Sequence, residues 1–290
     1  MKITTSVLQM FIDVGQESAL KQVKEAGFDG VDFPLYWSKY HDTLLGENYK
    51  EVALEEKKKL LDANLICNQT HAPFMHFQYE NVMDESDEMY LRLVRAIEVT
   101  SILGAEYIVI HNVKVPDGVD FFEYNLKYFK SFEKYCKKFN VKIAVENLYK
   151  KDEKRDCYVG RLGKPEELNA FLDALNSPYY VACVDIGHAA LTGVEPENYI
   201  LGVKKEYLKV FHIHDNNYKA DNHYLPYFGL FDWNKITKAI AKTGYEGNFN
   251  LETECIRYMD EDFKIEGLKF TYKIAKKLVE KIEEYKKTEQ

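Results

Sequence analysis

The sequence lacks the features that mark membrane, disulfide-rich and nucleic-acid-binding proteins. Its apolar runs are only as long as single strands, which excludes a membrane-spanning helix. Its five cysteines are odd in number and form no CxxC pair, so we expect free thiols in a reducing compartment, with Cys67 and Cys183 inside apolar strands. The net charge of −8 leaves no basic surplus, which argues against a polyanionic partner such as DNA.

Linkers and targeting segments are missing as well. No Pro-, Gly- or Ser-rich stretch divides the chain, so we expect a single domain over residues 1–290. The opening residues, Met1-Lys-Ile-Thr-Thr-Ser, contain no apolar core of a signal peptide, and we therefore expect a cytoplasmic protein. The content of 46% hydrophobic and 30% charged residues is that of an ordinary globular chain.

What the sequence does contain is a regular alternation of strand-like and helix-like segments. Short apolar runs precede amphipathic ones, and Gly27, Gly104 and Gly244 mark expected helix ends. We expect strands at 2–8, 28–33, 65–70, 107–110, 141–145, 179–184, 210–213 and 248–251, and helices at 16–25, 51–63, 83–103, 121–139, 164–175, 195–205, 232–242 and 263–285. Eight such units predict an α/β fold, a single (β/α)8 TIM barrel. The alternative, a doubly wound sheet, requires a glycine-rich fingerprint after the first strand, where Gly15 stands alone.

One segment, residues 212–223, has the highest density of histidine and aspartate side chains. His212 and His214 alternate at the end of an apolar strand, so their side chains point the same way, and Asp215, Asp221 and His223 follow. Imidazole and carboxylate groups are the common ligands of divalent Zn, Mn, Fe or Co. For this strand alone, half-buried histidines and a solvated loop explain the pattern equally well.

Other expected strands end in the same residue types. Because the active site of a (β/α)8 barrel lies at the C-terminal ends of its strands, these side chains should converge. A single histidine is more often a packed side chain than a ligand, but six of the eight histidines lie at strand ends or just beyond, which predicts a metal site. The residues concerned are His71, His111, Glu146, Asp185, His188, His212, His214 and Glu252, with Asp221 and His223 in the following loop.

Four consecutive strands supply the expected ligands of one divalent ion, which are Glu146, Asp185, His212 and Glu252. His188, three residues after Asp185, can lean over the same site and bind either a substrate hydroxyl or a second ion. We expect His214 and Glu254, which share the ligands' side of their strands, to orient the ligands rather than bind the ion.

These motifs resemble the xylose isomerase-like barrel superfamily, which unites sugar isomerases and epimerases with endonuclease IV-type abasic-site nucleases (AP endonuclease family 2). The resemblance runs in order along the whole chain through His71-Ala-Pro, Ile-His111, Val-Glu146-Asn, Val-Asp185-Ile-Gly-His188, Phe-His212-Ile-His-Asp215, Asp221-Asn-His223 and Leu-Glu252-Thr. It implies a metal-dependent isomerase or epimerase of a sugar or sugar phosphate. It also implies one bound ion, Mn²⁺ in first place with Co²⁺, Mg²⁺ or Zn²⁺ as alternatives.

The resemblance further implies that Glu146 and Glu252 form the acid/base pair on opposite faces of a bound ketose. One carboxylate removes a proton next to the carbonyl and the other returns it, while the ion stabilises the enediolate. Ketose 3-epimerases of the group usually carry an arginine shortly after the seventh strand, where only Lys219 stands here, and this puts a tagatose- or psicose-type substrate in doubt. The expected substrate contacts are His71, His111, His188, Lys219 and Trp37.

Three other functions stay open. An endonuclease IV-like nuclease would use three zinc ions, with His71, His111, His188, Asp221 and His223 as additional metal ligands. The acidic charge and the run Asp221-Asn-His-Tyr-Leu-Pro, which looks like isomerase-type members, favour the isomerase. A keto-inositol dehydratase and a non-catalytic barrel that keeps its metal are the others.

The expected partner is a small-molecule sugar, with no nucleic acid and no membrane, and relatives often form homodimers or tetramers. The basic residues after Glu146 are expected to form a solvated loop, which is the simpler reading than a contact for a sugar phosphate. They are Lys150, Lys151, Lys154 and Arg155.

Overall fold

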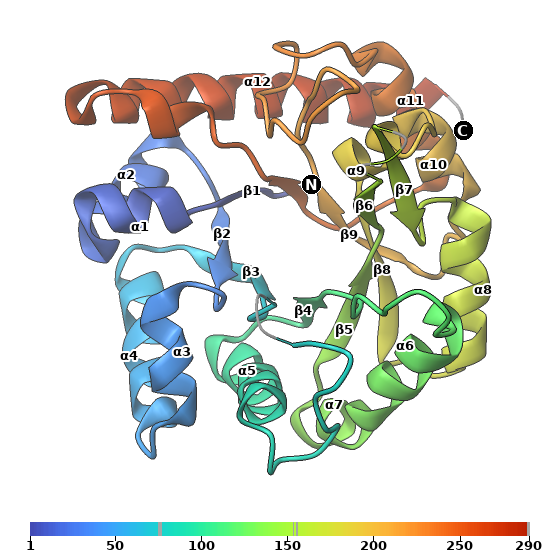
Figure 1. The fold of residues 1–290 in the computed structure, drawn as a ribbon. Helices are drawn as coiled ribbons and strands as arrows, with labels where there is room; N and C mark the ends of the chain where they lie inside the picture. The colour runs from blue at the N-terminus through green and yellow to red at the C-terminus, as the bar shows by residue number, and fades with distance from the viewer. Residues whose placement is uncertain (75–76, 153, 155, 289–290) are drawn as a thin grey trace.

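Eight parallel strands form a barrel in the computed structural model, which describes residues 1–74, 77–152, 154 and 156–288 (Figure 1). Their order around the barrel is β10-β1-β2-β3-β4-β5-β8-β9. Ile213 closes the ring, because its amide donates to Asn250 O at 2.9 Å and its carbonyl accepts from Glu252 N at 3.0 Å. The strands are β1 Ile3–Ser6, β2 Gly30–Pro34, β3 Ile66–His71, β4 Tyr107–Ile110, β5 Lys142–Glu146, β8 Tyr180–Asp185, β9 Leu208–His212 and β10 Phe249–Leu251.

Helices surround the strands on all sides, as Figure 1 shows in a view down the barrel. This arrangement confirms the predicted (β/α)8 barrel. The expected glycine stops are confirmed too, because Gly27, Gly104 and Gly244 adopt the left-handed conformation at the ends of α2, α5 and α11. The helices are α1 Leu8–Val14, α2 Gln16–Ala26, α3 Ser38–Leu45, α4 Tyr49–Asp62, α5 Glu88–Leu103, α6 Phe121–Ser131, α7 Glu133–Phe139, α8 Pro165–Leu175, α9 Ile186–Leu191, α10 Pro196–Gly202, α11 Trp233–Thr243 and α12 Glu261–Thr288, with a short 3₁₀ turn η1 Cys255–Tyr258.

Several element boundaries differ from the predicted ones. The helix expected from residue 83 begins at Glu88, because the Asp87 side chain caps it by accepting from Tyr90 N. The helix expected over 121–139 is divided at Phe132 into α6 and α7. The short helices α1, α3 and α9 were not predicted, and α9 is capped by Asp185, whose carboxylate accepts from His188 N at 2.7 Å.

The interior of the barrel is divided between an apolar half and a polar half. The apolar half is a small cluster around Val109 and Val210. The polar half consists of buried side chains on β1, β2, β3 and β10, so that hydrogen-bonding groups lie directly beneath the strand ends. These side chains are Thr4, Asp32, Asn68, Gln69 and Asn250.

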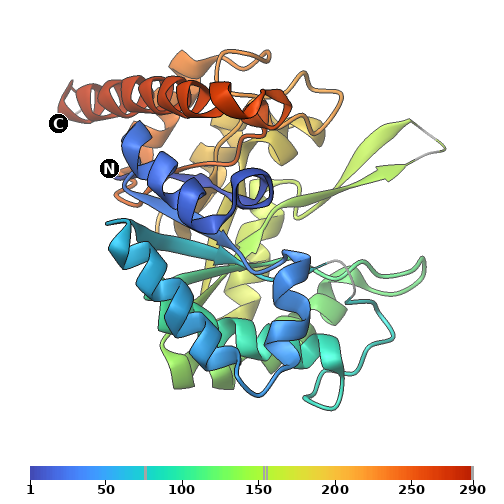
Figure 2. The same ribbon diagram turned by 90° about the vertical axis from the view of Figure 1, so that its left-hand side faces the viewer.

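A two-stranded antiparallel hairpin, β6 Leu148–Asp152 and β7 Cys157–Arg161, follows β5. Figure 2 shows it reaching away from the barrel, on the side opposite to the two chain termini. The prediction of a basic loop here was wrong, since Lys150 and Lys151 lie in β6; Arg155 lies outside the described residues. The hairpin therefore extends the rim of the barrel next to Glu146.

The described thiols are free, as expected. Cys67, Cys136 and Cys183 are buried and Cys157 is exposed, with no disulfide among them. Among the helices of the described residues, none has the length and apolar character to cross a membrane.

Candidate metal centre

Three carboxylates and one imidazole meet at the C-terminal ends of four neighbouring strands. Glu146 ends β5, Asp185 ends β8, His212 ends β9 and Glu252 directly follows β10. His212 Nδ1 lies 2.9 Å from both Glu146 Oε1 and Glu252 Oε2, and 3.8 Å from Asp185 Oδ2. One donor atom from each of the four side chains lies within 4.8 Å of all the others. The structure thus brings together the four residues expected to bind one ion.

The charges of this group depend on one another. Burial alone would lower the pKa of His212, but Cys183, Glu252 and Glu146 hold it well above its usual value. Burial would likewise raise the pKa of Glu146, but His212 and His111 hold it well below its usual value. Three carboxylates gathered around a single imidazole require further positive charge. A divalent ion fits this donor set of oxygens and one nitrogen.

A second group of donors, His71, His111 and Glu146, shares Glu146 with the first. His111 Nε2 lies 2.8 Å and His71 Nε2 lies 3.9 Å from Glu146 Oε2. Burial, with the charge of His111, lowers the pKa of His71 to about 3, so its imidazole is neutral at pH 7. A neutral imidazole can bind either a metal ion or a substrate hydroxyl.

A third group consists of His214, Asp221 and His223. His223 Nε2 lies 3.2 Å from Asp221 Oδ2, and the rings of His214 and His223 stack 4.2 Å apart. His214 Nε2 lies 3.1 Å from both carboxylate oxygens of Asp185. His214 therefore contacts one of the four central residues.

His188 lies between the central group and the third group. Its Nδ1 is 2.9 Å from Asn147 O and therefore carries a hydrogen, which leaves Nε2 3.4 Å from Asp221 Oδ2. Burial would lower the pKa of His188, but Asp185, Asp221 and Glu146 raise it to about 10. The neighbouring carboxylates therefore favour the protonated form of this side chain.

Two of the expected substrate contacts, Trp37 and Lys219, are not members of the donor groups described above. The Trp37 ring packs against Phe11, with 6.0 Å between ring centroids, and Lys219 is exposed in a turn after β9. The neighbouring Tyr36 instead lines a cavity beside Glu252. The role expected for Trp37 stays a prediction, and Tyr36, next to it in the sequence, is a further candidate for contact with substrate.

Two hollows open the centre to solvent. One, of about 120 Å³, is lined by Tyr36, His223 and Glu252. The other, of about 620 Å³, is lined by His111 and Asn112 on the side of β4 and the hairpin. The smaller hollow thus reaches the central group at Glu252, and the larger one reaches His111, which adjoins Glu146.

A buried polar column beneath the centre was not foreseen from the sequence. His212 Nε2 lies 3.0 Å from Gln69 Nε2 and 3.7 Å from Asp32 Oδ2, and Gln69 Nε2 donates to Asp32 Oδ2 at 2.9 Å. Asn250 Nδ2 donates to the same oxygen at 3.4 Å. Burial raises the pKa of Asp32 to about 7, although His212 lowers it. Gln69 therefore contacts the side of the His212 ring that faces away from the central carboxylates, and Asp32 holds Gln69 in place.

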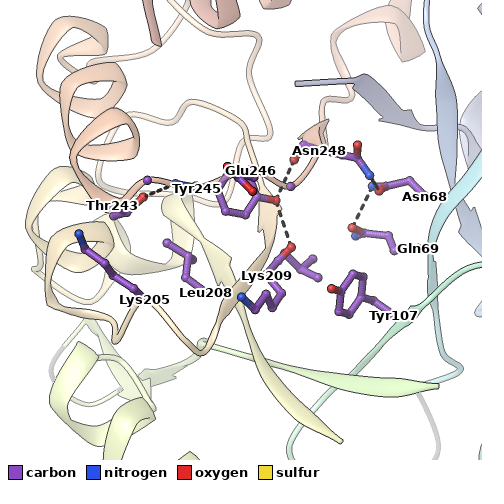
Figure 3. Close-up of a pocket in the computed structure, with 13 residues that line it drawn as sticks. Asn68, Gln69, Tyr107, Lys205, Leu208, Lys209, Thr243, Tyr245, Glu246 and Asn248 are labelled. Carbon is purple, nitrogen blue, oxygen red and sulfur yellow. Dashed lines mark hydrogen bonds between the residues drawn. The ribbon is translucent and has the colours of Figure 1, made fainter. Parts of the chain in front are cut away.

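The column continues to the N-terminal end of the barrel. Asn250 accepts from Thr4, and Thr4 accepts from Asn68 Nδ2, at 2.8 and 3.0 Å. Asn68 also pairs with Asn248 at a cavity of about 360 Å³ (Figure 3). This cavity lies at the opposite ends of the strands from His212.

The Asp32→Asn variant should bind a divalent ion about 10- to 100-fold more weakly, because Asp32 accepts from Gln69, which contacts His212 Nε2, and such outer partners set the orientation and basicity of a ligating imidazole. Titration calorimetry with Mn²⁺ and with Zn²⁺ measures this. The matched control is Thr4→Val, which changes the same column without contacting His212. Equal affinities of wild type and Asp32→Asn would show that Asp32 does not support the ligand.

The comparisons with known proteins agree on the fold. A family model described as the xylose isomerase-like TIM barrel matches residues 20–274. The uncharacterized protein y4fM of Sinorhizobium fredii is 27% identical over 281 residues, which cover 87% of this chain and 85% of that protein. The crystal structure of a D-tagatose 3-epimerase-like protein covers 98% of this chain and 99% of its own, with a TM-score of 0.75 and 21% identity. The structure of the IolI protein with a zinc atom covers the same shares, with a TM-score of 0.70 and 14% identity.

Proposed function

The chain belongs to the xylose isomerase-like TIM barrel family, and on this basis we propose that it is a sugar isomerase or epimerase that depends on one divalent metal ion. The observation that carries the proposal is the central group of Glu146, Asp185, His212 and Glu252. Its two glutamates come from different strands and approach the same imidazole nitrogen, which suits a reaction that takes a proton from one position and returns it at another. The similarity to a D-tagatose 3-epimerase-like structure along the whole chain supports this class of reaction.

The four central residues would hold the ion. We favour Mn²⁺, with Co²⁺, Mg²⁺ or Zn²⁺ as alternatives, because carboxylate oxygens outnumber nitrogen in the donor set. The zinc atom in the IolI structure supports a divalent ion in a barrel of this fold. When bound, the ion supplies positive charge where negative charge develops on the oxygens of the substrate.

Glu146 and Glu252 would act as the acid/base pair. Around the barrel, β8 and β9 separate the two carboxylates, yet both reach the same nitrogen of His212. One carboxylate takes the proton from the carbon next to the carbonyl, and the other returns a proton to the opposite face or to the neighbouring carbon. His111 and His188 lie beside this pair and would bind substrate hydroxyls.

Solvent exchange tests the proposal. The Mn²⁺-loaded protein should incorporate one deuterium from D₂O next to the carbonyl of its ketose substrate, with formation of an isomer or epimer. A panel of ketoses and ketose phosphates, analysed by mass spectrometry and chromatography, measures this. The absence of exchange in every member of the panel with metal-loaded protein would contradict the proposal.

One observation favours a second candidate, the endonuclease IV-like nuclease. The three donor groups are contiguous, and Glu146 belongs to two of them, so the described residues offer ligands for more than one ion. Several ions suit phosphodiester hydrolysis, in which the attacking and leaving oxygens both carry charge. The net charge of −8 weighs against a DNA substrate. The isomerase proposal predicts that the protein does not cleave a DNA duplex that contains an abasic site.

A further inference from the structure

The larger hollow beside the candidate metal centre has the chemistry of a binding groove. It has a volume of about 620 Å³ and begins at His111, whose Nε2 lies 2.8 Å from Glu146 Oε2. Its walls come from the segments after β3 and β4 and from the base of the β6–β7 hairpin. A molecule in the groove can therefore contact His111, which adjoins the central carboxylate of Glu146.

Arg161 lines this groove and has no counterion among the residues that the structure describes. Arg161 pairs with Leu148 across the hairpin, and both side chains line the groove, as expected for opposed residues of an antiparallel pair. Among the described residues, its guanidinium makes no hydrogen bond or ion pair, whereas Arg92, Arg95 and Arg257 all make one or both. Burial lowers the pKa of Arg161, and no carboxylate offsets this cost. In a chain with 47 acidic residues, such a guanidinium is suited to an incoming oxyanion.

Asn112 offers an unused acceptor in the same groove. Its side chain is 5% exposed, and its Nδ2 donates to Glu146 O at 3.3 Å. Its Oδ1 is buried and makes no hydrogen bond within the described part of the chain. Burying an acceptor without a partner is costly, and a hydroxyl of a bound molecule would satisfy it.

Aromatic rings and one further cation complete the groove. Phe74 stacks on His111 with 4.4 Å between the ring centroids and offers an apolar face to the C–H groups of a sugar. Lys114 is exposed at the groove and adds positive charge, while Glu80 is the acidic residue of the lining. The groove thus combines an oxyanion donor, a hydroxyl acceptor and a flat apolar face.

The length of the groove suits a small sugar. Leu148 lies two residues beyond Glu146, which is about 7 Å along a strand, and Arg161 lies about 5 Å across the hairpin from Leu148. The length of the Arg161 side chain reduces the distance that a substrate must span between Glu146 and the guanidinium. The terminal substituent of a five- or six-carbon ketose can therefore reach the guanidinium while its carbonyl lies at Glu146.

We propose that the substrate is a sugar with an anionic end, a phosphate or a carboxylate, and that Arg161 binds this group while Asn112 Oδ1 accepts from a sugar hydroxyl. The placement of the substrate carbonyl at Glu146 rests on the proposed isomerase function. The anion site rests on Arg161 and the groove alone, so each can fail without the other.

Binding of anions to the Mn²⁺-loaded protein tests the site directly. Titration calorimetry should show that inorganic phosphate binds, and that fructose 6-phosphate binds about 10-fold or more tightly than fructose. The Arg161→Gln variant should lose this preference and bind phosphate about 10- to 100-fold more weakly, and Arg161→Lys should restore part of it. Lys242→Gln, which removes one exposed charge on α11, is the control and should match wild type. Gluconate in place of fructose 6-phosphate distinguishes a carboxylate from a phosphate.

The outcomes separate the two proposals. Anion binding that depends on Arg161, in a protein that exchanges no ketose proton, would support the anion site and contradict the isomerase function. Turnover of a neutral ketose that is unchanged in Arg161→Gln, without any preference for fructose 6-phosphate or gluconate, would overturn the anion site. Binding of an abasic-site duplex that depends on Arg161 and excludes fructose 6-phosphate would overturn the assignment to a small sugar.

Discussion

Glu146→Gln should reduce turnover by about 10²- to 10⁴-fold while the divalent ion stays bound. The amide keeps the size of the side chain and one carbonyl oxygen for the ion, but it cannot take up a proton. In the structure, Glu146 Oε1 and Glu252 Oε2 are equally distant from His212 Nδ1. Either carboxylate can therefore face a substrate that lies beside His212. Steady-state kinetics on the substrate found by deuterium exchange measures the loss, and elemental analysis measures the retained ion.

Glu254→Gln is the matched control for this variant. Glu254 lines the cavity next to Glu252, and its carboxylate pairs with Arg257 rather than with the ligands that it was expected to orient; it does not belong to the central donor group. Its replacement removes the same charge and should change turnover by less than about tenfold. Wild-type turnover in Glu146→Gln would sink the acid/base assignment. Loss of the ion together with turnover would show that Glu146 is needed as a ligand, and would leave its proton-transfer role without support.

Removal of the divalent ion should abolish turnover and lower the melting temperature. Without it, the carboxylates of Glu146, Asp185 and Glu252 remain close together with a single imidazole between them. A ligand present at 100 times its dissociation constant stabilises the folded state by about 2.7 kcal/mol. For a chain of 290 residues this corresponds to a shift of about 4 °C. Chelation followed by thermal unfolding and activity assays, with and without added Mn²⁺, measures both effects.

His212→Asn is the control for the effect of the ion. It removes the imidazole that contacts all three carboxylates, so added Mn²⁺ should no longer raise its melting temperature. Full turnover after chelation, with no ion detected in the sample, would contradict a metal-dependent reaction. An equal thermal shift in wild type and His212→Asn would place the binding ion elsewhere.

The barrel and the location of the site could be predicted from the sequence because both depend on local and repeated signals. Gly27 and Gly104 stop helices by a conformation that glycine adopts easily, and the apolar runs give the strands. In a parallel barrel all strand ends meet at one rim, so the residues that follow each run must be neighbours. This geometric rule is sufficient to predict that Glu146, Asp185 and His212 lie close together.

The polar column was not predicted, because its members lie in the middle of strands. Asp32 lies between Val31 and Phe33, as it also would in a strand with one face in water, and Gln69 lies in the polar run Asn68-Gln69-Thr70. Only closure of the barrel shows that their side chains point into the interior, beneath His212. A strand buried on both faces should carry few polar residues, so the polar residues within these strands were a usable signal.

The hairpin was missed because its first strand is rich in lysine and aspartate, which are uncommon in strands. Its partner, Cys157–Arg161, has the β-branched and aromatic residues that would have indicated pairing. The position of Arg161 follows from this pairing, because the register places it opposite Leu148 and close to Glu146. Without the hairpin, Arg161 would be one more surface charge.

Counting the ions bound per chain distinguishes a single metal site from several. The protein, purified without added chelator and analysed by elemental mass spectrometry, should contain about one Mn, Co, Mg or Zn ion per chain, held by Glu146, Asp185, His212 and Glu252. About three zinc ions per chain would contradict the single-ion isomerase. Such a result would make His71, His111, Asp221 and His223 metal ligands and would favour the abasic-site nuclease over the sugar isomerase.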